Sequence, residues 1–402
     1  MLPYQKDLIT PVTQKYIEMR KIGILTFHRS INYGAFMQSY ALSHEIMKRF
    51  GPIVEIVDFE IEYKNAHYKE PLYHLIGGKE YYVKYKRFKS DLNLLPLSHE
   101  TIISNDFDKL RDYLSKNYEI VIVGSDAVWA FQKMELENPY WLFGDKLDCK
   151  KMSYAASAHS TDFKKVKDPE KNYIAKCLKS FQYIGVRDEE TYNFIKSTDN
   201  SLNVQRNCDP TILLGKSDNN IAKYILKKNN LDLGKPIIGI MTAAIRYMPG
   251  IIKYLGKEYQ FINLYKRNRL MDKYYPFNRS RYINNLSPFE WSHLYASFYM
   301  NFTNYFHGTL LGLINNIPTL AFDTTNFPYE YKGKIKQVME DLDLNDYYFE
   351  YHKMNKNDEM RLLSQIDFTL RNHKEIREKI SFNLIKEKER AESFFKSLSE
   401  IL

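Results

Sequence analysis

Polar side chains that could carry chemistry stand directly after several of the strands expected in this sequence. Arg187 and Asp188 follow the apolar run YIGV, Asp209 follows VQRNC, and His307 lies just past YMNFTN. Other groups in the same position relative to a strand are His28, Arg29, Asn32, Tyr33, Gly34, Gly124, Ser125, Asp126, Trp129, Gly308 and Thr309. Arginine binds anions, and a histidine at the start of a helix can hold a proton beside a bound anion.

Each of these groups also has a purely structural interpretation. Residues 32–34 form a good helix-start turn, and residues 124–126 form a strand-to-helix turn with a capping residue. Arg187 could pair with a neighbouring carboxylate on the surface, and His307 could be a structural histidine. The functional interpretation depends on whether these side chains come together at one place in the fold. In parallel α/β lobes the carboxyl ends of the strands share one edge, and ligands bind at that edge.

Strands and helices alternate along the chain in a pattern that predicts two α/β lobes. Expected strands lie at 21–27, 53–60, 119–126, 152–157, 183–188, 204–211, 237–241, 259–265, 299–304 and 318–322. Expected helices lie at 35–50, 106–114, 171–181, 189–196, 288–297 and 308–315. We place the lobes at 19–212 and 236–357, with a linker and helix at 213–235. Residues 1–18 are expected to be an extension or a mis-assigned start, and helices over 358–402 are expected to pack across both lobes.

The amino-acid composition narrows the class of protein but does not indicate which ligand it binds. The 402 residues carry 58 basic and 49 acidic side chains, a formal charge of +9, with 44% apolar residues. This is the composition of a folded chain of two or three domains. Cys149, Cys177 and Cys208 form no CxxC pair, which favours a reduced, cytoplasmic protein without structural zinc. The charged first 20 residues do not resemble a signal peptide, and there is no apolar run long enough for a membrane span.

Seven motifs in order resemble the polysaccharide pyruvyl transferase family. They are IGILTFHRSINYGAFMQSYAL, VIVGSDAVW, YAAS, GVRDEE, CDPTILL, SPFEWSHLYAS and FHGTLLGLINNIPTLAF, and the resemblance spans about residues 19–345. It implies two Rossmann-like lobes facing a cleft, as in the glycosyltransferase B architecture. It also implies transfer of pyruvate from phosphoenolpyruvate to two hydroxyls of a sugar, giving a cyclic ketal and free phosphate. The expected partners are phosphoenolpyruvate and a sugar or lipid-linked glycan, with no metal, no redox cofactor and no nucleic acid.

The resemblance also implies roles for individual residues. His307 matches the family's motif histidine, so it is expected to be the catalytic acid that protonates the donor's methylene carbon. Arg187 is expected to hold the donor anion. Further donor contacts are expected from the amides of Gly308 and Thr309 and from Lys332, Lys334 and Arg246. Contacts to the acceptor or the cleft are expected from Asn32, Tyr33, Gly34, Ser125, Asp126 and Trp129.

This sequence departs from the family's pattern at two places. Tyr305 stands where some members have an arginine, so that donor contact would be supplied elsewhere, for example by Arg246, Arg267 or Arg269. After Asp126 the chain continues with residues 127–130, AVWA, where members usually have Gln-x-Trp-Asn. A nucleotide-sugar glycosyltransferase on the same architecture and a family member without catalysis therefore remain alternatives.

A basic and aromatic segment at 79–89, KEYYVKYKRFK, has its own set of interpretations. It could touch lipid-linked glycan at the inner face of a membrane, or it could bind nucleic acid. The pattern is also typical of an amphipathic helix whose aromatic side chains face the protein while its lysines face water, and we favour that interpretation.

Overall fold

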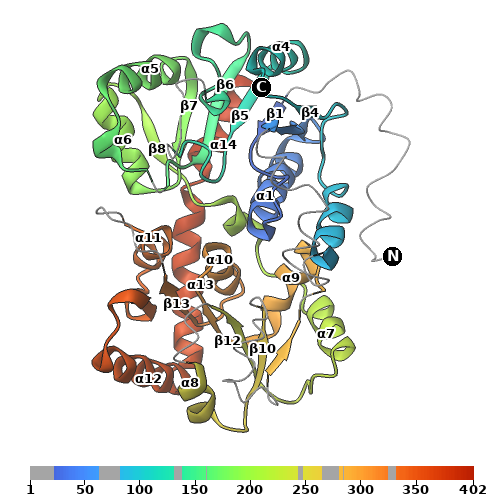
Figure 1. Cartoon of the computed structure of the whole chain (residues 1–402), viewed down its shortest axis with the longest axis vertical. Helices are drawn as coiled ribbons and strands as arrows, with labels where there is room; N and C mark the ends of the chain where they lie inside the picture. The colour runs from blue at the N-terminus through green and yellow to red at the C-terminus, as the bar shows by residue number, and fades with distance from the viewer. Residues whose placement is uncertain are drawn as a thin grey trace.

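The computed structural model describes residues 22–62, 82–130, 138–159, 161–242, 248–264, 280–283, 285–324 and 332–402. They form two parallel six-stranded sheets covered by helices, one in each lobe (Figure 1). A small pair, β3 (Phe59–Glu60) and β4 (Ile102–Ile103), lies beside the first sheet. Both halves of the chain therefore alternate strand and helix, as the sequence predicted.

The first sheet has the strand order β2-β1-β5-β6-β7-β8, and every neighbouring pair is parallel. Its strands are β1 (Ile22–Leu25), β2 (Val54–Ile56), β5 (Ile120–Val123), β6 (Lys150–Ala156), β7 (Phe181–Val186) and β8 (Val204–Arg206). The helices of this lobe include α1 (Tyr33–Phe50), α4 (Phe107–Asn117), α5 (Asp168–Leu178) and α6 (Glu189–Thr198). The central strands are almost continuously apolar because helices cover both faces of the sheet.

The second sheet has the order β11-β10-β9-β12-β13-β14, again all parallel. Its strands are β9 (Ile237–Met241), β10 (Gln260–Asn263), β11 (Ser280–Tyr282), β12 (Phe298–Thr303), β13 (Thr319–Asp323) and β14 (Tyr348–Glu350). Its helices include α8 (Met248–Leu255), α9 (Pro288–Leu294), α10 (Phe306–Ile314) and α11 (Lys334–Asp341). Between the two sheets along the chain, α7 (Asn219–Lys228) packs against α9.

Three helices end the chain: α12 (Lys356–Arg371), α13 (His373–Glu389) and α14 (Glu392–Ile401). In Figure 1, α13 runs from the second lobe toward the first, and α14 lies behind the first sheet. Phe394 packs on Tyr154 and Tyr183 of that sheet, with ring centroids 4.8 and 5.5 Å apart. α13 packs against α10 of the second lobe. The last helices therefore contact both lobes.

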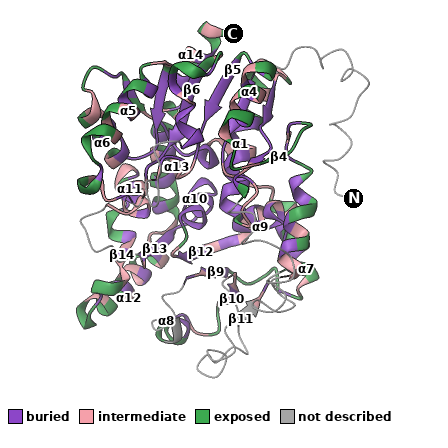
Figure 2. Ribbon diagram, turned by 45° about the horizontal axis from the view of Figure 1, so that its top comes forward, coloured by how far each residue is buried: buried purple, intermediate pink, exposed green. Residues whose placement is uncertain are grey.

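The buried residues are concentrated in the two sheets and in the helix α10. Figure 2 shows most of the central strands and α10 as buried, whereas exposed residues gather on outer helices such as α5, α6 and α12. All nine residues of α10 are buried. Because α10 is the helix that carries His307, this histidine is held by a rigid, apolar element.

Most expected elements are confirmed, with two differences that matter for position. The expected strand at 53–60 is divided into β2, which pairs with β1, and β3, which pairs with β4. The helix expected at 308–315 begins at Phe306, so His307 lies inside its first turn. The short strands β11 and β14 were not expected.

Candidate functional site

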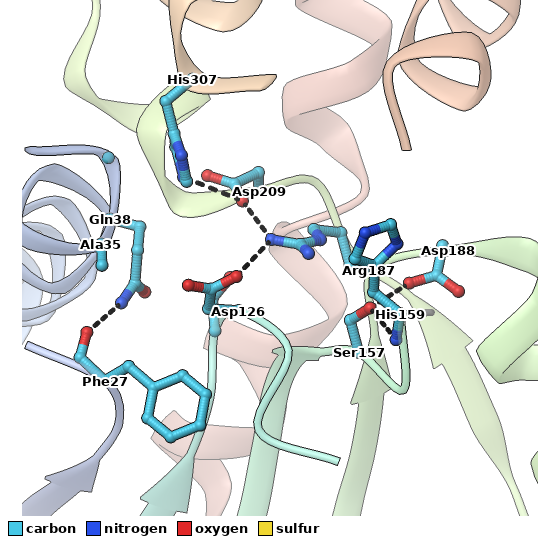
Figure 3. Close-up of polar contacts among 12 residues, drawn as sticks. Phe27, Ala35, Gln38, Asp126, Ser157, His159, Arg187, Asp188, Asp209 and His307 are labelled. Atoms are coloured by element: carbon cyan, nitrogen blue, oxygen red, sulfur yellow. Dashed lines mark hydrogen bonds and ion pairs between the residues drawn. The ribbon is translucent and has the colours of Figure 1, made fainter. Parts of the chain in front are cut away.

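Arg187 follows β7 and is the centre of a buried group of charges at the carboxyl edge of the first sheet (Figure 3). Its Nη1 lies 3.0 Å from Oδ2 of Asp209 and 3.6 Å from Oδ1 of Asp126. Burial alone would lower the pKa of the guanidinium, but these two carboxylates overcome that effect and raise it. Arg187 also stacks over the ring of Phe306 from the other lobe, at 4.8 Å.

Two nitrogens of Arg187 are buried without an acceptor. Among the described residues, neither Nε nor Nη2 has a hydrogen-bond partner, although the side chain is only 4% exposed. A buried donor without an acceptor costs free energy, so native structures seldom keep one unless a ligand or water satisfies it. Arg187 therefore has two buried N–H donors that no described residue satisfies.

Asp126 is placed by the turn after β5. Its φ of 78° lies in the left-handed region, which aspartate tolerates better than most residues. Burial would raise the pKa of this carboxyl, but Arg187, Lys334 and His307 together lower it to about 2. Asp126 is therefore ionised at neutral pH and balances one positive charge of the group.

His307 reaches the same group from the second lobe. Its Nε2 lies 3.9 Å from Oδ2 of Asp209 and has no hydrogen-bond partner among the described residues. Burial is the main reason that its pKa falls to about 4, and Asp209 and Asp126 oppose that fall. At neutral pH, without a bound anion, the imidazole is therefore neutral.

Gly34 of α1 provides the surface against which the His307 ring rests. A Cβ atom at Gly34 would lie 2.0 Å from Nδ1 and 2.4 Å from Cγ of the imidazole. Asn32 caps this helix by accepting hydrogen bonds from the amides of Gly34 and Ala35. The expected turn at 32–34 therefore holds the start of α1 close to the histidine.

The two candidate lysines separate in the structure. Lys334, the first residue of α11, lies over the Phe306 ring with its Nζ 5.0 Å from the centroid. Burial lowers its pKa, and Asp126 is the largest opposing influence. Lys332 instead pairs with Glu189 at 3.0 Å and with Glu340 at 2.6 Å. Lys334 thus belongs to the charged group, whereas Lys332 joins α6 to α11.

The first turn of α10 adds backbone donors beside the histidine. Tyr305, the N-cap, makes no side-chain cap, so the amides of Phe306, His307 and Gly308 have no acceptor within the helix. The Thr309 amide, in contrast, donates to the Tyr305 carbonyl at 2.8 Å. The expectation that Thr309 offers a free amide is therefore wrong, because the helix begins two residues earlier than expected.

Other expected cleft residues have different surroundings. Trp129 is fully buried, stacks on Trp141 at 4.6 Å and donates to the Tyr140 carbonyl, so a direct contact with an acceptor does not fit its position. Tyr33 packs near Trp291 and donates to the Leu286 carbonyl, which joins α1 to the second lobe.

Ser125 is fully buried beside Asp126, and its hydroxyl has no hydrogen-bond partner among the described residues. Two more side chains near this edge do have structural partners. His28 and Arg29 both bond the carboxylate of Asp58 and are thereby occupied.

Two more residues lie near the group. Asp209 was singled out from the sequence by its position after a strand but was given no role, and it connects Arg187 with His307. His159 was not singled out from the sequence. His159 follows β6, and burial, then Lys334 and Arg187, lower its pKa to about 3. Ser157, next to it, donates to Asp188 at 2.6 Å.

Some expectations fall outside the described residues. Arg246, Arg267 and Arg269 lie there, as do the extension at 1–18 and the first residues of the segment at 79–89. Residues 82–92 are helical and include the described part of that segment, 82–89. Tyr85 and Phe88 are buried, and Arg87 pairs with Glu290. These two aromatic side chains thus face the protein and Lys86 and Lys89 are exposed, as favoured from the sequence, whereas Lys84 lies over the Tyr33 ring with its Nζ 4.7 Å from the centroid.

The described residues contain neither a candidate metal centre nor a candidate membrane span. No three histidine, cysteine, aspartate or glutamate side chains among them gather closely enough to hold a metal ion. Within the same residues, no helix combines the length and apolar character needed to cross a bilayer.

Solved structures with a similar fold define the class of this protein. UDP-GlcNAc 2-epimerase from Neisseria meningitidis, bound to UDP-GlcNAc, matches with a TM-score of 0.55 at 10% identity over 95% of this chain and 100% of that chain. UDP-GlcNAc 2-epimerase from Methanocaldococcus jannaschii matches with a TM-score of 0.53 at 11% identity, over 86% and 92% of the two chains. Sucrose-phosphate synthase from Thermosynechococcus elongatus gives 0.52 at 9% identity, over 95% and 100%. The protein therefore has a glycosyltransferase B-like fold.

The family follows from the sequence itself. The profile of the polysaccharide pyruvyl transferase family matches residues 32–326, which is most of the chain. The chain belongs to this family, and its members are transferases. No curated protein sequence matches the chain.

Proposed function

We propose that this protein transfers pyruvate from phosphoenolpyruvate to a sugar of a surface polysaccharide or its precursor, and that the products are a cyclic pyruvate ketal and phosphate. Family membership supports transfer to a sugar acceptor. Phosphoenolpyruvate carries a carboxylate and a phosphate, and such a donor requires directed cationic and amide donors.

One observation carries the choice of donor. Arg187 from the first lobe and Lys334 from the second both lie over the ring of Phe306, which is the first residue of α10. The unpartnered nitrogens of Arg187 and His307 lie in this group. An anion there would receive guanidinium, ammonium and first-turn amide donors, while a proton donor would stand next to it.

In the proposed reaction, the order of events follows from the state of His307. The imidazole is neutral before the donor binds, because burial lowers its pKa to about 4. A bound donor brings negative charge close to the ring and favours the imidazolium, so His307 takes up a proton. The imidazolium gives that proton to the donor's methylene carbon, and a sugar hydroxyl bonds to the adjacent carbon while its own proton passes to the imidazole. The carbon–oxygen bond to phosphate then breaks, with the bonding electron pair leaving on phosphate. The second hydroxyl bonds to the same carbon, its proton goes to the departing phosphate, and the ketal ring is closed.

The test is release of phosphate when the protein is incubated with phosphoenolpyruvate and candidate nucleotide- or lipid-linked sugars. His307→Ala should reduce turnover by about 100-fold or more, because a general acid contributes at least that much. Arg187→Ala should reduce turnover by a comparable factor, because it removes the guanidinium that holds the donor anion. Arg111→Ala is the matched control, since Arg111 pairs with Asp108 and Asp112 on the outer face of α4. That variant should keep turnover close to that of the parent.

Two results would overturn the proposal. If His307→Ala or Arg187→Ala keeps turnover within about tenfold of the parent, the role assigned to that residue is wrong. Calorimetry in which the protein binds uridine or guanosine diphosphate but not phosphoenolpyruvate would indicate a nucleotide-sugar donor instead. The reaction is expected in the cytoplasm, with the acceptor presented in solution or at the inner membrane surface.

A further inference from the structure

Asp209 is the residue that links the two groups on which the proposed function rests. A single oxygen, Oδ2, lies 3.0 Å from Nη1 of Arg187 and 3.9 Å from Nε2 of His307 (Figure 3). The Asp209 side chain is only 1% exposed, so little water screens either interaction. Arg187 belongs to the first lobe and His307 to the second, so this oxygen is shared between the lobes.

The orientation of this carboxylate is fixed by its own backbone. Oδ1 accepts a hydrogen bond from the Thr211 amide at 3.0 Å and caps the 3-10 helix at Pro210–Leu214. That short helix packs against α1 and α10. With Oδ1 held by the cap, Oδ2 is directed toward the arginine and the histidine, and the carboxylate has little freedom to turn away.

The charges around His307 give Asp209 a specific effect. The groups that face the imidazole are the carboxylates of Asp209 and Asp126 and the cations of Lys334 and Arg187. The two carboxylates favour the imidazolium, and Asp209 is the stronger of the pair. It is also the carboxylate that lies within 4 Å of the ring among the described residues. The imidazolium is thus stabilised mainly by a residue that also holds the donor arginine.

We propose that Asp209 is a positioning residue that couples donor binding to protonation of His307, by orienting Arg187 and by providing the counter-charge for the imidazolium. In the free protein its charge is balanced by Arg187. When a donor anion occupies the remaining guanidinium nitrogens, Oδ2 stays beside the ring and stabilises the proton that His307 takes up. This inference depends on the proposed function, since it assigns a role within the same reaction.

Asp209→Asn is the decisive variant. Asparagine retains an oxygen that accepts from the Thr211 amide, so the cap and the fold are expected to survive. The variant removes one negative charge beside the donor, so the KM for phosphoenolpyruvate should fall or stay unchanged while kcat falls by about tenfold or more. The alkaline limb of the kcat profile should also move to lower pH by about one unit or more, because the imidazolium loses its nearest counter-charge. A purely structural role would raise KM and leave the pH profile in place.

A binding experiment tests the same coupling without any acceptor sugar. Phosphoenolpyruvate is titrated into the protein by calorimetry at pH 7.5 in two buffers of different ionisation enthalpy, which reports the protons taken up on binding. The parent should take up protons, and Asp209→Asn should take up distinctly fewer. Asp126→Asn is the matched comparison, because it also removes a carboxylate near Arg187 but from a residue farther from the ring, so its proton uptake should change less.

The possible outcomes separate the two proposals. If the parent neither binds nor turns over phosphoenolpyruvate, the proposed function fails. If the parent is active but Asp209→Asn has the parent's pH limb and proton uptake, the role of Asp209 is refuted, even where kcat is lower. If Asp209→Asn melts far below the parent, Asp209→Ser, which keeps a capping oxygen without the charge, is measured in its place and must show the same shifts.

Discussion

Gly34 of the first lobe lies against the His307 ring of the second, and this contact makes a sharp prediction for Gly34→Ala. The added Cβ would lie 2.0 Å from Nδ1 of the ring, where ordinary contact begins near 3.4 Å. The imidazole would therefore have to move by more than ~1 Å, and misplacement of that size costs a catalytic group about 100-fold in rate. We expect phosphate release by Gly34→Ala to fall by about this factor.

The same substitution should also change the free energy of unfolding. Whether it lowers or raises that free energy should depend on the presence of the His307 side chain. In the parent, overpacking of this kind costs roughly 1–3 kcal/mol of the free energy of unfolding. In a His307→Ala background the obstacle is gone, and alanine in place of glycine in a helix stabilises by up to about 1 kcal/mol. Gly34→Ala is thus predicted to destabilise the parent and to stabilise the His307→Ala variant.

Urea denaturation of the four proteins measures this reversal of sign, and the phosphate-release assay measures the catalytic effect in the parent background. The reasoning fails if Gly34→Ala retains turnover within about threefold of the parent, because the ring would then not rest on the glycine. It also fails if Gly34→Ala changes the free energy of unfolding equally in both backgrounds, since the two residues would then act independently.

Three further predictions concern residues around the site and the core. Lys334→Ala should raise the KM for phosphoenolpyruvate by about tenfold or more, whereas Lys332→Ala should change it little and cost at most about 1 kcal/mol of stability, as steady-state kinetics and urea denaturation would show. Burial raises the pKa of Glu387 to about 7, so its stabilising contribution is present below about pH 4.5 and is lost as pH rises through 7. The decline in unfolding free energy between pH 5 and 7.5 should therefore be shallower in Glu387→Gln by on the order of 2 kcal/mol. Trp129→Ala should cost roughly 3–5 kcal/mol by urea denaturation, because it empties a buried indole site.

The fold was largely predictable because several of its central strands are almost continuously apolar. Runs such as IVIV in β5 and IIGIM in β9 are typical of parallel strands covered on both faces, and the loops after them carried the polar groups. The strands β11 and β14 lacked that signal, since each is only three residues long, too short to show a periodicity of its own. The edge strands β2 and β8 are equally short, but they lie within the longer runs IVEIVDFE and VQRNCDPT that indicated strands.

The sequence predicted which loops meet at the site. It did not predict which side-chain and backbone atoms point into it. Spacing did not separate Lys332 from Lys334, since the difference depends on pairing with Glu189 on the other lobe. The free amides of α10 depended on its start at Phe306, and helix ends are the least certain feature of a sequence pattern. Trp129 looked accessible because it follows a strand, yet the chain turns it into the core.

The C-terminal helices have a consequence for how the protein is made. The first sheet is complete once β8 has been synthesised, yet Tyr154 and Tyr183 on its face are covered by Phe394, which is translated almost last. At 5–20 residues per second, the ribosome needs roughly 10–40 s to reach that helix after β7 has emerged. During this interval the nascent first lobe exposes aromatic surface, so chaperone binding to the growing chain is expected to persist until the C-terminal helices are released.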